Sequence, residues 1–189
     1  MTSDAPAFKE WHVIVEALLA GEQLLVLRKG GIAEGRSGFS PDHARRFWLF
    51  PSRFHAQAEK TKPAAARHFT PAASDEFVTL QAFAEVAHHA FITDWDAVAR
   101  LDSLHIWTTA TVRERFDWST PPGIHAFVLR VHRCAAPITL PLTPDLAGCK
   151  SWVEVPLDFD TSPSAPVLGD AAFAARLEEL KALLSPEST

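Results

Sequence analysis

The chain has 189 residues, a length that suits one domain able to bury a hydrophobic core without disulfides or metal ions. Its net charge of −5 argues against indiscriminate nucleic-acid binding, and its two cysteines are too few for a disulfide framework. No run approaches the roughly 18 apolar residues of a membrane span, and the polar N-terminal residues lack the apolar centre of a secretory signal. We therefore expect one cytoplasmic domain over residues 1–189, without membrane association.

The charge is distributed unevenly along the chain. Residues 28–69 contain nine Lys or Arg against three Asp or Glu, so this segment carries a charge of +6 and the rest of the chain −11. A local basic segment on an acidic protein favours one anionic partner at one place. The alternative is a loop region whose charges point in different directions and stay in solvent.

The first elements expected are one helix and two strands. Apolar residues at three- and four-residue spacing predict a helix from Ala7 to Leu19 that ends at Gly21. The apolar run Gln23–Arg28 predicts a short buried strand. Residues 47–50 predict a second strand, which ends at Pro51 because proline has no N–H to donate to a neighbouring strand.

The segments around these strands are less regular. Residues 32–46 are rich in glycine, proline and charge and predict a long loop. Ser52 is a candidate N-cap for a short helix, and residues 60–73 have no clear period and predict a surface connection. Residues 76–92 alternate in a way that favours a long strand, although their alanines also suit a helix.

Capped helices and a clear strand are expected in the second half. Asp94 is a candidate N-cap for a helix to Leu101, and Thr108 or Thr109 for a helix to Phe116. Residues 124–132 alternate cleanly and give the clearest strand, and residues 151–155 predict the last strand. Residues 170–184 predict a closing helix with one apolar stripe. Since strands do not alternate regularly with crossover helices, we expect an α+β fold, a mostly antiparallel sheet with packed helices.

Four segments carry distinctive motifs in a fixed order. They are Phe8–Leu19, which contains Lys9-Glu10-Trp11, then Leu27–Ile32, Phe47–Pro51 and Ala147–Trp152. With these motifs the chain resembles the domain of unknown function 1802 family over roughly residues 8–156. Some members of that family are fused to a restriction-endonuclease-like domain of the Mrr type. The resemblance therefore implies a role near the restriction and modification of DNA.

The basic segment contains the candidate anion-binding residues. Arg28, Lys29, Gly30 and Gly31 lie where a strand opens into a loop, and backbone amides beside two cations can hold a phosphate. A tight turn with two solvated charges is the alternative, and no P-loop motif is present. The full set of candidate anion- or nucleic-acid-binding residues is Arg28, Lys29, Gly30, Gly31, Arg36, Arg45, Arg46 and Arg53.

Cations and aromatic residues are mixed around residues 107–118. Base stacking next to phosphate contact needs this mixture, which makes Trp107 and Trp118 candidate stacking surfaces. The alternative is that the aromatic rings belong to the core and that arginine stems pack over them.

Evidence for catalysis or metal binding is weak. His55 and Glu34 are the candidate acid–base residues, with no nucleophile legible nearby. Cys149, next to Lys150, is expected to be inert, and the spacing of Cys and His matches no common zinc pattern. We expect neither metal nor cofactor. Arg130 lies inside an apolar strand and is expected to form a structural ion pair.

Three functions remain open from the sequence. The first is a non-catalytic nucleic-acid-associated module, an accessory of a DNA restriction-type system. The second is a small hydrolase acting on a phosphate-containing or other anionic substrate, which convergence of Arg28, Glu34 and His55 in one cleft would favour. The third is a structural subunit of a complex, which requires an exposed apolar patch of several hundred Å².

Overall fold

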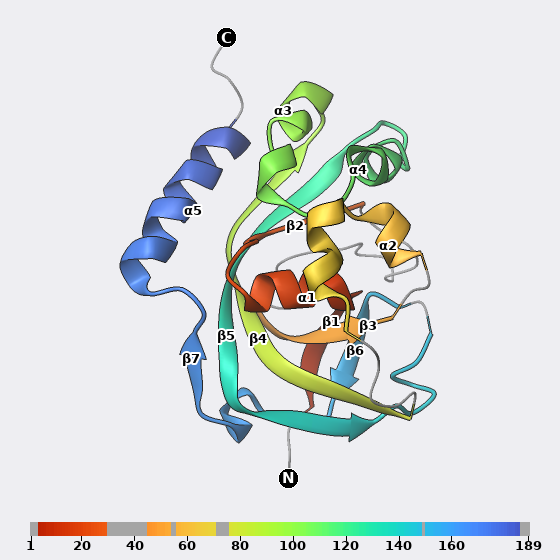
Figure 1. The fold of residues 1–189 in the computed structure, drawn as a ribbon, viewed down its shortest axis with the longest axis vertical. Helices are drawn as coiled ribbons and strands as arrows, with labels where there is room; N and C mark the ends of the chain where they lie inside the picture. The colour runs from red at the N-terminus through yellow and green to blue at the C-terminus, as the bar shows by residue number, and fades with distance from the viewer. Residues whose placement is uncertain (1–3, 30–44, 54–55, 71–75, 149, 186–189) are drawn as a thin grey trace.

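The structure is a computed structural model that describes residues 4–29, 45–53, 56–70, 76–148 and 150–185. Among these residues seven strands form one sheet with the order β2-β5-β4-β3-β1-β6, and β7 pairs with β5 (Figure 1). The strands are β1 (Ala5–Trp11), β2 (Leu25–Arg28), β3 (Arg46–Ser52), β4 (Phe77–Ile92), β5 (Ile124–Pro141), β6 (Trp152–Val155) and β7 (Ser164–Pro166). The pairs are antiparallel except β1 with β3. The predicted α+β fold with a mostly antiparallel sheet is confirmed.

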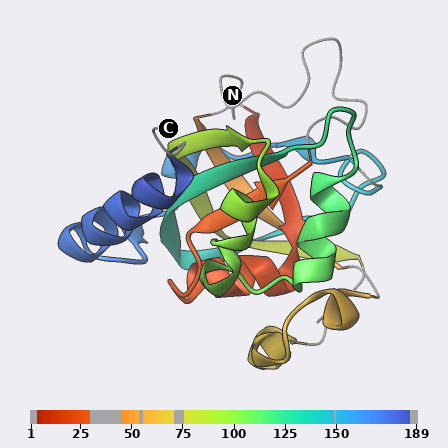
Figure 2. The same ribbon diagram turned by 90° about the horizontal axis from the view of Figure 1, so that it is seen from above.

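Helices lie on both sides of this sheet. They are α1 (His12–Leu19), α2 (Gln57–Lys60), α3 (Trp95–Ala99), α4 (Thr109–Phe116) and α5 (Asp170–Leu184), with 3₁₀ turns η3 (Pro63–His68), η4 (Asp102–Leu104) and η5 (Phe159–Thr161). In Figure 1, β4 and β5 curve through the molecule with α1 on their inner side and α5 on their outer side. Figure 2 shows α4 and α5 on opposite sides of the curved sheet. None of the helices in the described residues has the length and apolar character that a bilayer crossing requires.

Both predicted threonine and aspartate caps occur. The Asp94 carboxylate accepts N–H groups of residues 96 and 97 at the start of α3. Thr108 accepts the N–H of Thr111 at the start of α4. Ser52 does not cap a helix, because it is the last residue of β3 and α2 begins after Ala56.

The predicted helix from Ala7 to Leu19 is wrong in its first half. Residues up to Trp11 form β1, and only His12–Leu19 are helical. β1 pairs with β3 on one side and β6 on the other, with Phe8 opposite both Leu49 and Trp152. Hydrogen bonds to two neighbours outweigh a local helical period, since propensity is a weak preference compared with tertiary pairing. The ambiguous residues 76–92 form a strand with two register irregularities.

Alternation along β1 divides its side chains between two apolar clusters. Phe8 packs in the larger cluster with α1, whereas Ala7 packs in the smaller one with Trp48 and Phe50. Since neighbouring strand residues face opposite sides, the next pair, Lys9 and Glu10, must also point apart. The successive residues Lys9 and Glu10 therefore place a cation on one side of the sheet and a carboxylate on the other.

The sheet is strongly curled. In a flat sheet the five steps from β2 to β6 would separate these strands by about 24 Å, at about 4.8 Å per step. Instead Arg28, the last residue of β2, donates from Nη2 to Oγ of Ser151, immediately before β6, at 2.7 Å. The two ends of the strand order therefore meet through side chains.

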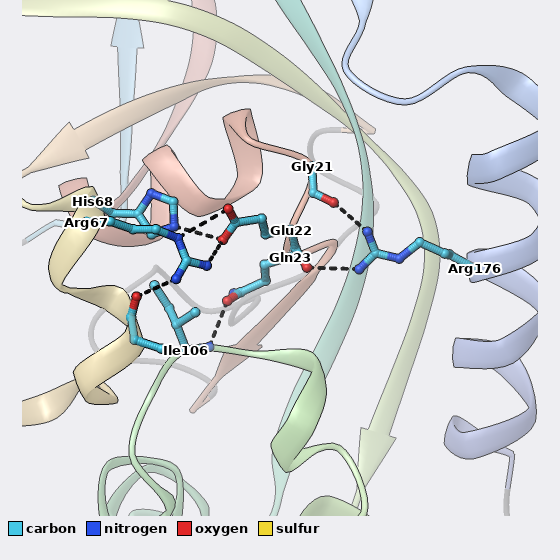
Figure 3. Close-up of polar contacts among 8 residues, drawn as sticks. Gly21, Glu22, Gln23, Arg67, His68, Ile106 and Arg176 are labelled. Carbon is cyan, nitrogen blue, oxygen red and sulfur yellow. Dashed lines mark hydrogen bonds and ion pairs between the residues drawn. The ribbon is translucent and has the colours of Figure 1, made fainter.

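The turn at residues 21–23 contacts α5, η3 and the segment at residue 106 (Figure 3). Arg176 of α5 donates to the carbonyl oxygens of Gly21 and Glu22. The Glu22 carboxylate accepts from Arg67 and pairs with His68, both in η3. These bonds lower the pKa of Glu22, the Arg67 bond most. On the next residue, the Gln23 side-chain oxygen accepts the N–H of residue 106 at 3.0 Å.

Candidate functional site

A buried carboxylate lies where β1, β2 and the start of β6 meet. The Glu10 side chain has no exposed surface, and its Oε1 accepts the N–H of Trp11 at 2.8 Å. Its Oε2 lies 3.4 Å from Nη1 of Arg28, whose guanidinium also covers the ring of Phe8 at 4.9 Å. Together with the bond to Ser151, these contacts orient Arg28, the first predicted anion-binding residue.

Arg115 of α4 brings a second cation to the same place. It donates to a backbone carbonyl of β2 at 2.7 Å and lies over the rings of Trp11 and Trp107 at 4.9 and 4.7 Å. The pKa of Arg115 is lowered to about 10, mainly by burial, with Glu10 acting to raise it and Arg28 acting to lower it. The guanidinium therefore remains charged at neutral pH.

Lys29 and Trp118 are in direct contact although they are far apart in the sequence. The Lys29 Nζ lies 3.3 Å from the centre of the Trp118 ring, and Trp118 is 54% exposed. Burial lowers the pKa of Lys29; among its charged neighbours, Glu114 acts to raise this pKa, and Arg115, Arg28 and Lys60 act to lower it. Three cations and one carboxylate therefore act on the Lys29 amine.

These residues form one cluster of exposed and buried side chains, which we call the Lys29–Trp118 patch. Its members are Arg28, Lys29, Lys60, Arg115 and Trp118, together with the carboxylates Glu10 and Glu114. Lys60, at the end of α2, pairs with Glu114 of α4 at 2.6 Å. Four cations against two carboxylates leave the patch with an excess of positive charge beside an exposed indole ring. Such a surface can attract an anion and stack a planar group.

The other basic residues predicted for the site lie elsewhere. Arg46 pairs with Glu85 at 3.4 Å and covers Phe83 at 4.3 Å, beside the smaller apolar cluster. Arg45 is exposed just before β3, and Arg53 is exposed and donates to the carbonyl of Thr70 at 2.6 Å. Five further candidates, Gly30, Gly31, Glu34, Arg36 and His55, fall outside the described residues.

The two tryptophans predicted for stacking have different environments. Trp107 has no exposed surface and packs in the core with Arg115 over it, so it has no free face for a base in this structure. Trp118, just after α4, is open to solvent on the patch. The alternative interpretation, a core ring under an arginine stem, thus describes Trp107, while Trp118 is exposed and remains a candidate stacking surface.

Sequence reasoning missed Glu10, Lys60 and Ser151. Glu10 and Ser151 belong to the motifs Lys9-Glu10-Trp11 and Lys150-Ser151-Trp152, which were noted for their distinctiveness without an assigned role. In the structure Glu10 and Ser151 both contact Arg28. A carboxylate in a mostly apolar segment was the available signal, because such a group needs a cationic partner when it is buried.

Residues outside the patch confirm one expectation about charge. Arg130 of β5 forms an ion pair with Asp170 of α5, as expected for a cation in an apolar strand, and covers the ring of Phe173 at 4.6 Å.

Of the two cysteines, Cys134 is buried, and burial raises the pKa of its thiol. Cys149 lies outside the described residues.

The distinctive motifs converge behind the patch. The rings of Phe8, Phe47 and Trp152, each from a different motif, lie 5.0–5.6 Å apart and pack as one aromatic cluster. Arg28, from a further motif, covers Phe8. Segments separated by more than a hundred residues therefore build one local structure.

Among the comparisons with known proteins, a family model matches the chain. No curated protein and no solved structure matches the chain. The family described as a domain of unknown function (DUF1802) matches over residues 7–179, which include the residues of the Lys29–Trp118 patch and the aromatic cluster behind it. The chain belongs to the DUF1802 family.

Proposed function

We propose that this protein is a non-catalytic nucleic-acid-binding module that uses the Lys29–Trp118 patch. The contact between Lys29 and Trp118 carries the proposal, because it joins a residue predicted to bind phosphate to one predicted to stack a base. Arg28 and Lys29 bind the phosphate, and the exposed face of Trp118 stacks the base. The patch offers the combination of backbone neutralisation and stacking used by proteins that bind single strands.

Charge repulsion within the patch favours an anion. Arg115, Arg28 and Lys60 each act to lower the pKa of Lys29, so they also disfavour its charged form. A phosphate beside Lys29 offsets this repulsion and stabilises the protonated amine. The ligand thus adds negative charge to that of Glu114, which already acts to raise the pKa of Lys29.

The exposed ring favours single strands over duplexes. A base in a duplex is stacked on its neighbours, whereas a base in a single strand can leave its neighbours and stack on Trp118. Single-stranded DNA is the first ligand to test, since relatives fused to a restriction-endonuclease-like domain favour a role beside DNA restriction. If the patch neutralises about two phosphates, the logarithm of affinity falls with the logarithm of salt with a slope of about −1.4.

Fluorescence anisotropy with labelled single- and double-stranded DNA and RNA across a salt series tests the proposal. We expect single strands to bind best, with a shallow salt dependence, and Lys29→Ala to reduce that dependence. Trp118→Ala should weaken binding about 10-fold or more at every salt concentration.

Two matched substitutions serve as controls. Lys181→Ala removes an exposed lysine of α5, and Phe91→Ala removes a half-exposed ring of β4. Neither should change binding, because neither residue belongs to the patch. No binding at low salt, or equal losses in the patch and control variants, would refute the proposal.

A further inference from the structure

A cavity of about 770 Å³ opens at the ends of β1 and β3. Its size lies within the range of about 300–1,000 Å³ typical of small-molecule sites. The side chains that line it include Lys9, His12, Arg53, Phe50, Phe77 and Leu142. None of them belongs to the Lys29–Trp118 patch, so the cavity is a separate feature of the molecule.

Lys9 gives the cavity a buried cation. It is 8% exposed, donates from Nζ to the carbonyl of Gly148 at 3.1 Å, and lies 5.1 Å from the centre of the Phe50 ring. Phe50 is the register partner of Lys9 on β3, so both side chains leave the sheet on the same side. This side is opposite to that of Glu10, and the Glu10 carboxylate is engaged by Arg28 there.

Further polar groups line the same cavity. Arg53 donates to the carbonyl of Thr70, and Nε2 of His12 lies 2.6 Å from Oγ1 of Thr70. Burial, and secondarily the charge of Arg53, lowers the pKa of His12 to about 4, so His12 is neutral at pH 7. Glu16 contributes a carboxylate and accepts from Gln81 at 3.4 Å. Among the described residues, the charged groups that line the cavity therefore sum to one excess positive charge, from Lys9 and Arg53 against Glu16.

Part of the cavity lining is apolar and exposed. Phe77 is 48% exposed and Leu142 is 37% exposed, and both line the cavity. Val78 and Leu146, both buried in the smaller apolar cluster, extend the apolar surface inward. A ligand with an apolar body would remove the exposed side chains of Phe77 and Leu142 from water.

We infer that this cavity binds a small organic carboxylate, with its anionic head beside Lys9 and Arg53 and its apolar body against Phe50, Phe77 and Leu142. One excess positive charge matches a monoanion. A phosphate monoester carries about −1.5 to −2 at pH 7 and would leave negative charge uncompensated near Glu16. The inference does not depend on the proposed nucleic-acid function.

Three probes of one shape test the inference by calorimetry and ligand-observed NMR: 1-naphthoate, the neutral 1-naphthalenemethanol and 1-naphthyl phosphate. We expect saturable one-to-one binding of naphthoate with a Kd of about 0.1–1 mM, typical of a ligand of this size. The neutral alcohol should bind about 10-fold more weakly, and the phosphate more weakly than naphthoate. Naphthyl phosphate binding more tightly than naphthoate would overturn the assignment of a carboxylate.

Variants locate the binding. Lys9→Met keeps the length of the side chain and should weaken naphthoate binding about 10-fold or more without changing the alcohol. Arg53→Ala, at an exposed position where folding is not at risk, should weaken naphthoate about 2- to 5-fold. Lys29→Met, in the patch, is the control and should change nothing. No saturable binding below about 10 mM, or losses that do not distinguish Arg53→Ala from Lys29→Met, would overturn the inference.

Discussion

Glu10→Gln should destabilise the fold strongly. It keeps the shape of the side chain but removes the negative charge that compensates the partly buried Arg28. At the observed 3.4 Å between Glu10 and Arg28, a unit charge pair is worth about 5 kcal/mol at an effective dielectric constant of about 20. The Gln side-chain oxygen can still accept from Trp11, and Arg28, with 19% of its side chain exposed, recovers some hydration. We therefore expect a loss of about 2–4 kcal/mol, near the about 3–5 kcal/mol typical of breaking a buried pair.

Urea denaturation followed by tryptophan fluorescence measures this loss. With an m-value of about 2–3 kcal/mol/M for a chain of this size, the midpoint should fall by about 1 M. Adding Arg28→Met to Glu10→Gln should cost less than the sum of the two single changes, since it removes the cation left without its partner.

The matched control is Glu114→Gln. The Lys60–Glu114 pair is closer, at 2.6 Å, but the Glu114 side chain is 61% exposed. Exposed pairs contribute about 0–1 kcal/mol, so the midpoint should hardly change. Equal shifts for Glu10→Gln and Glu114→Gln would refute the reasoning that burial, rather than distance, decides the contribution of each pair.

Two further predictions concern pH and backbone conformation. Burial, followed by the charge of Lys62, lowers the pKa of His105 to about 4, so the unfolded chain takes up a proton between about pH 6.5 and 4 that the native protein does not. Stability should thus fall as the pH drops through this window, and His105→Gln should flatten the profile of urea midpoint against pH; an unchanged profile would contradict the assignment. Gly21→Ala should cost about 1–2 kcal/mol in the same assay, because Gly21 has a φ of +69° and an added Cβ would lie 3.0 Å from Leu168. Gly123→Ala should cost less, although its Cβ would lie 2.4 Å from the Phe91 ring, because that ring is half exposed and can move; the reverse order would show that Phe91 is fixed.

Local patterns predicted much of the fold correctly. The helix over residues 170–184 and the caps Asp94 and Thr108 depend on nearby residues, and all three occur in the structure. β1 was missed because its strand conformation depends on hydrogen bonds to β3 and β6, which follow it by about 40 and 150 residues. Periodicity within a short window does not contain that information.

The candidate site could be predicted only in part. Lys29 and Trp118 were identified by residue type, but the contact between them depends on how β2 and α4 meet. Trp107 has the same residue type and a similar neighbourhood, yet it is buried. Exposure distinguishes these two rings, and exposure follows from packing against elements distant in the sequence.

The pairing of β1 has a consequence for folding during protein synthesis. Phe8 of β1 lies opposite Trp152 of β6, so the strand gains its second neighbour only after about 140 more residues have been added, which takes about 7–30 s at translation rates of about 5–20 residues per second. During this interval one edge of β1 remains unpaired and open to other nascent chains. Ribosome-bound chains that stop before β6 should therefore be the species of this protein most dependent on chaperones.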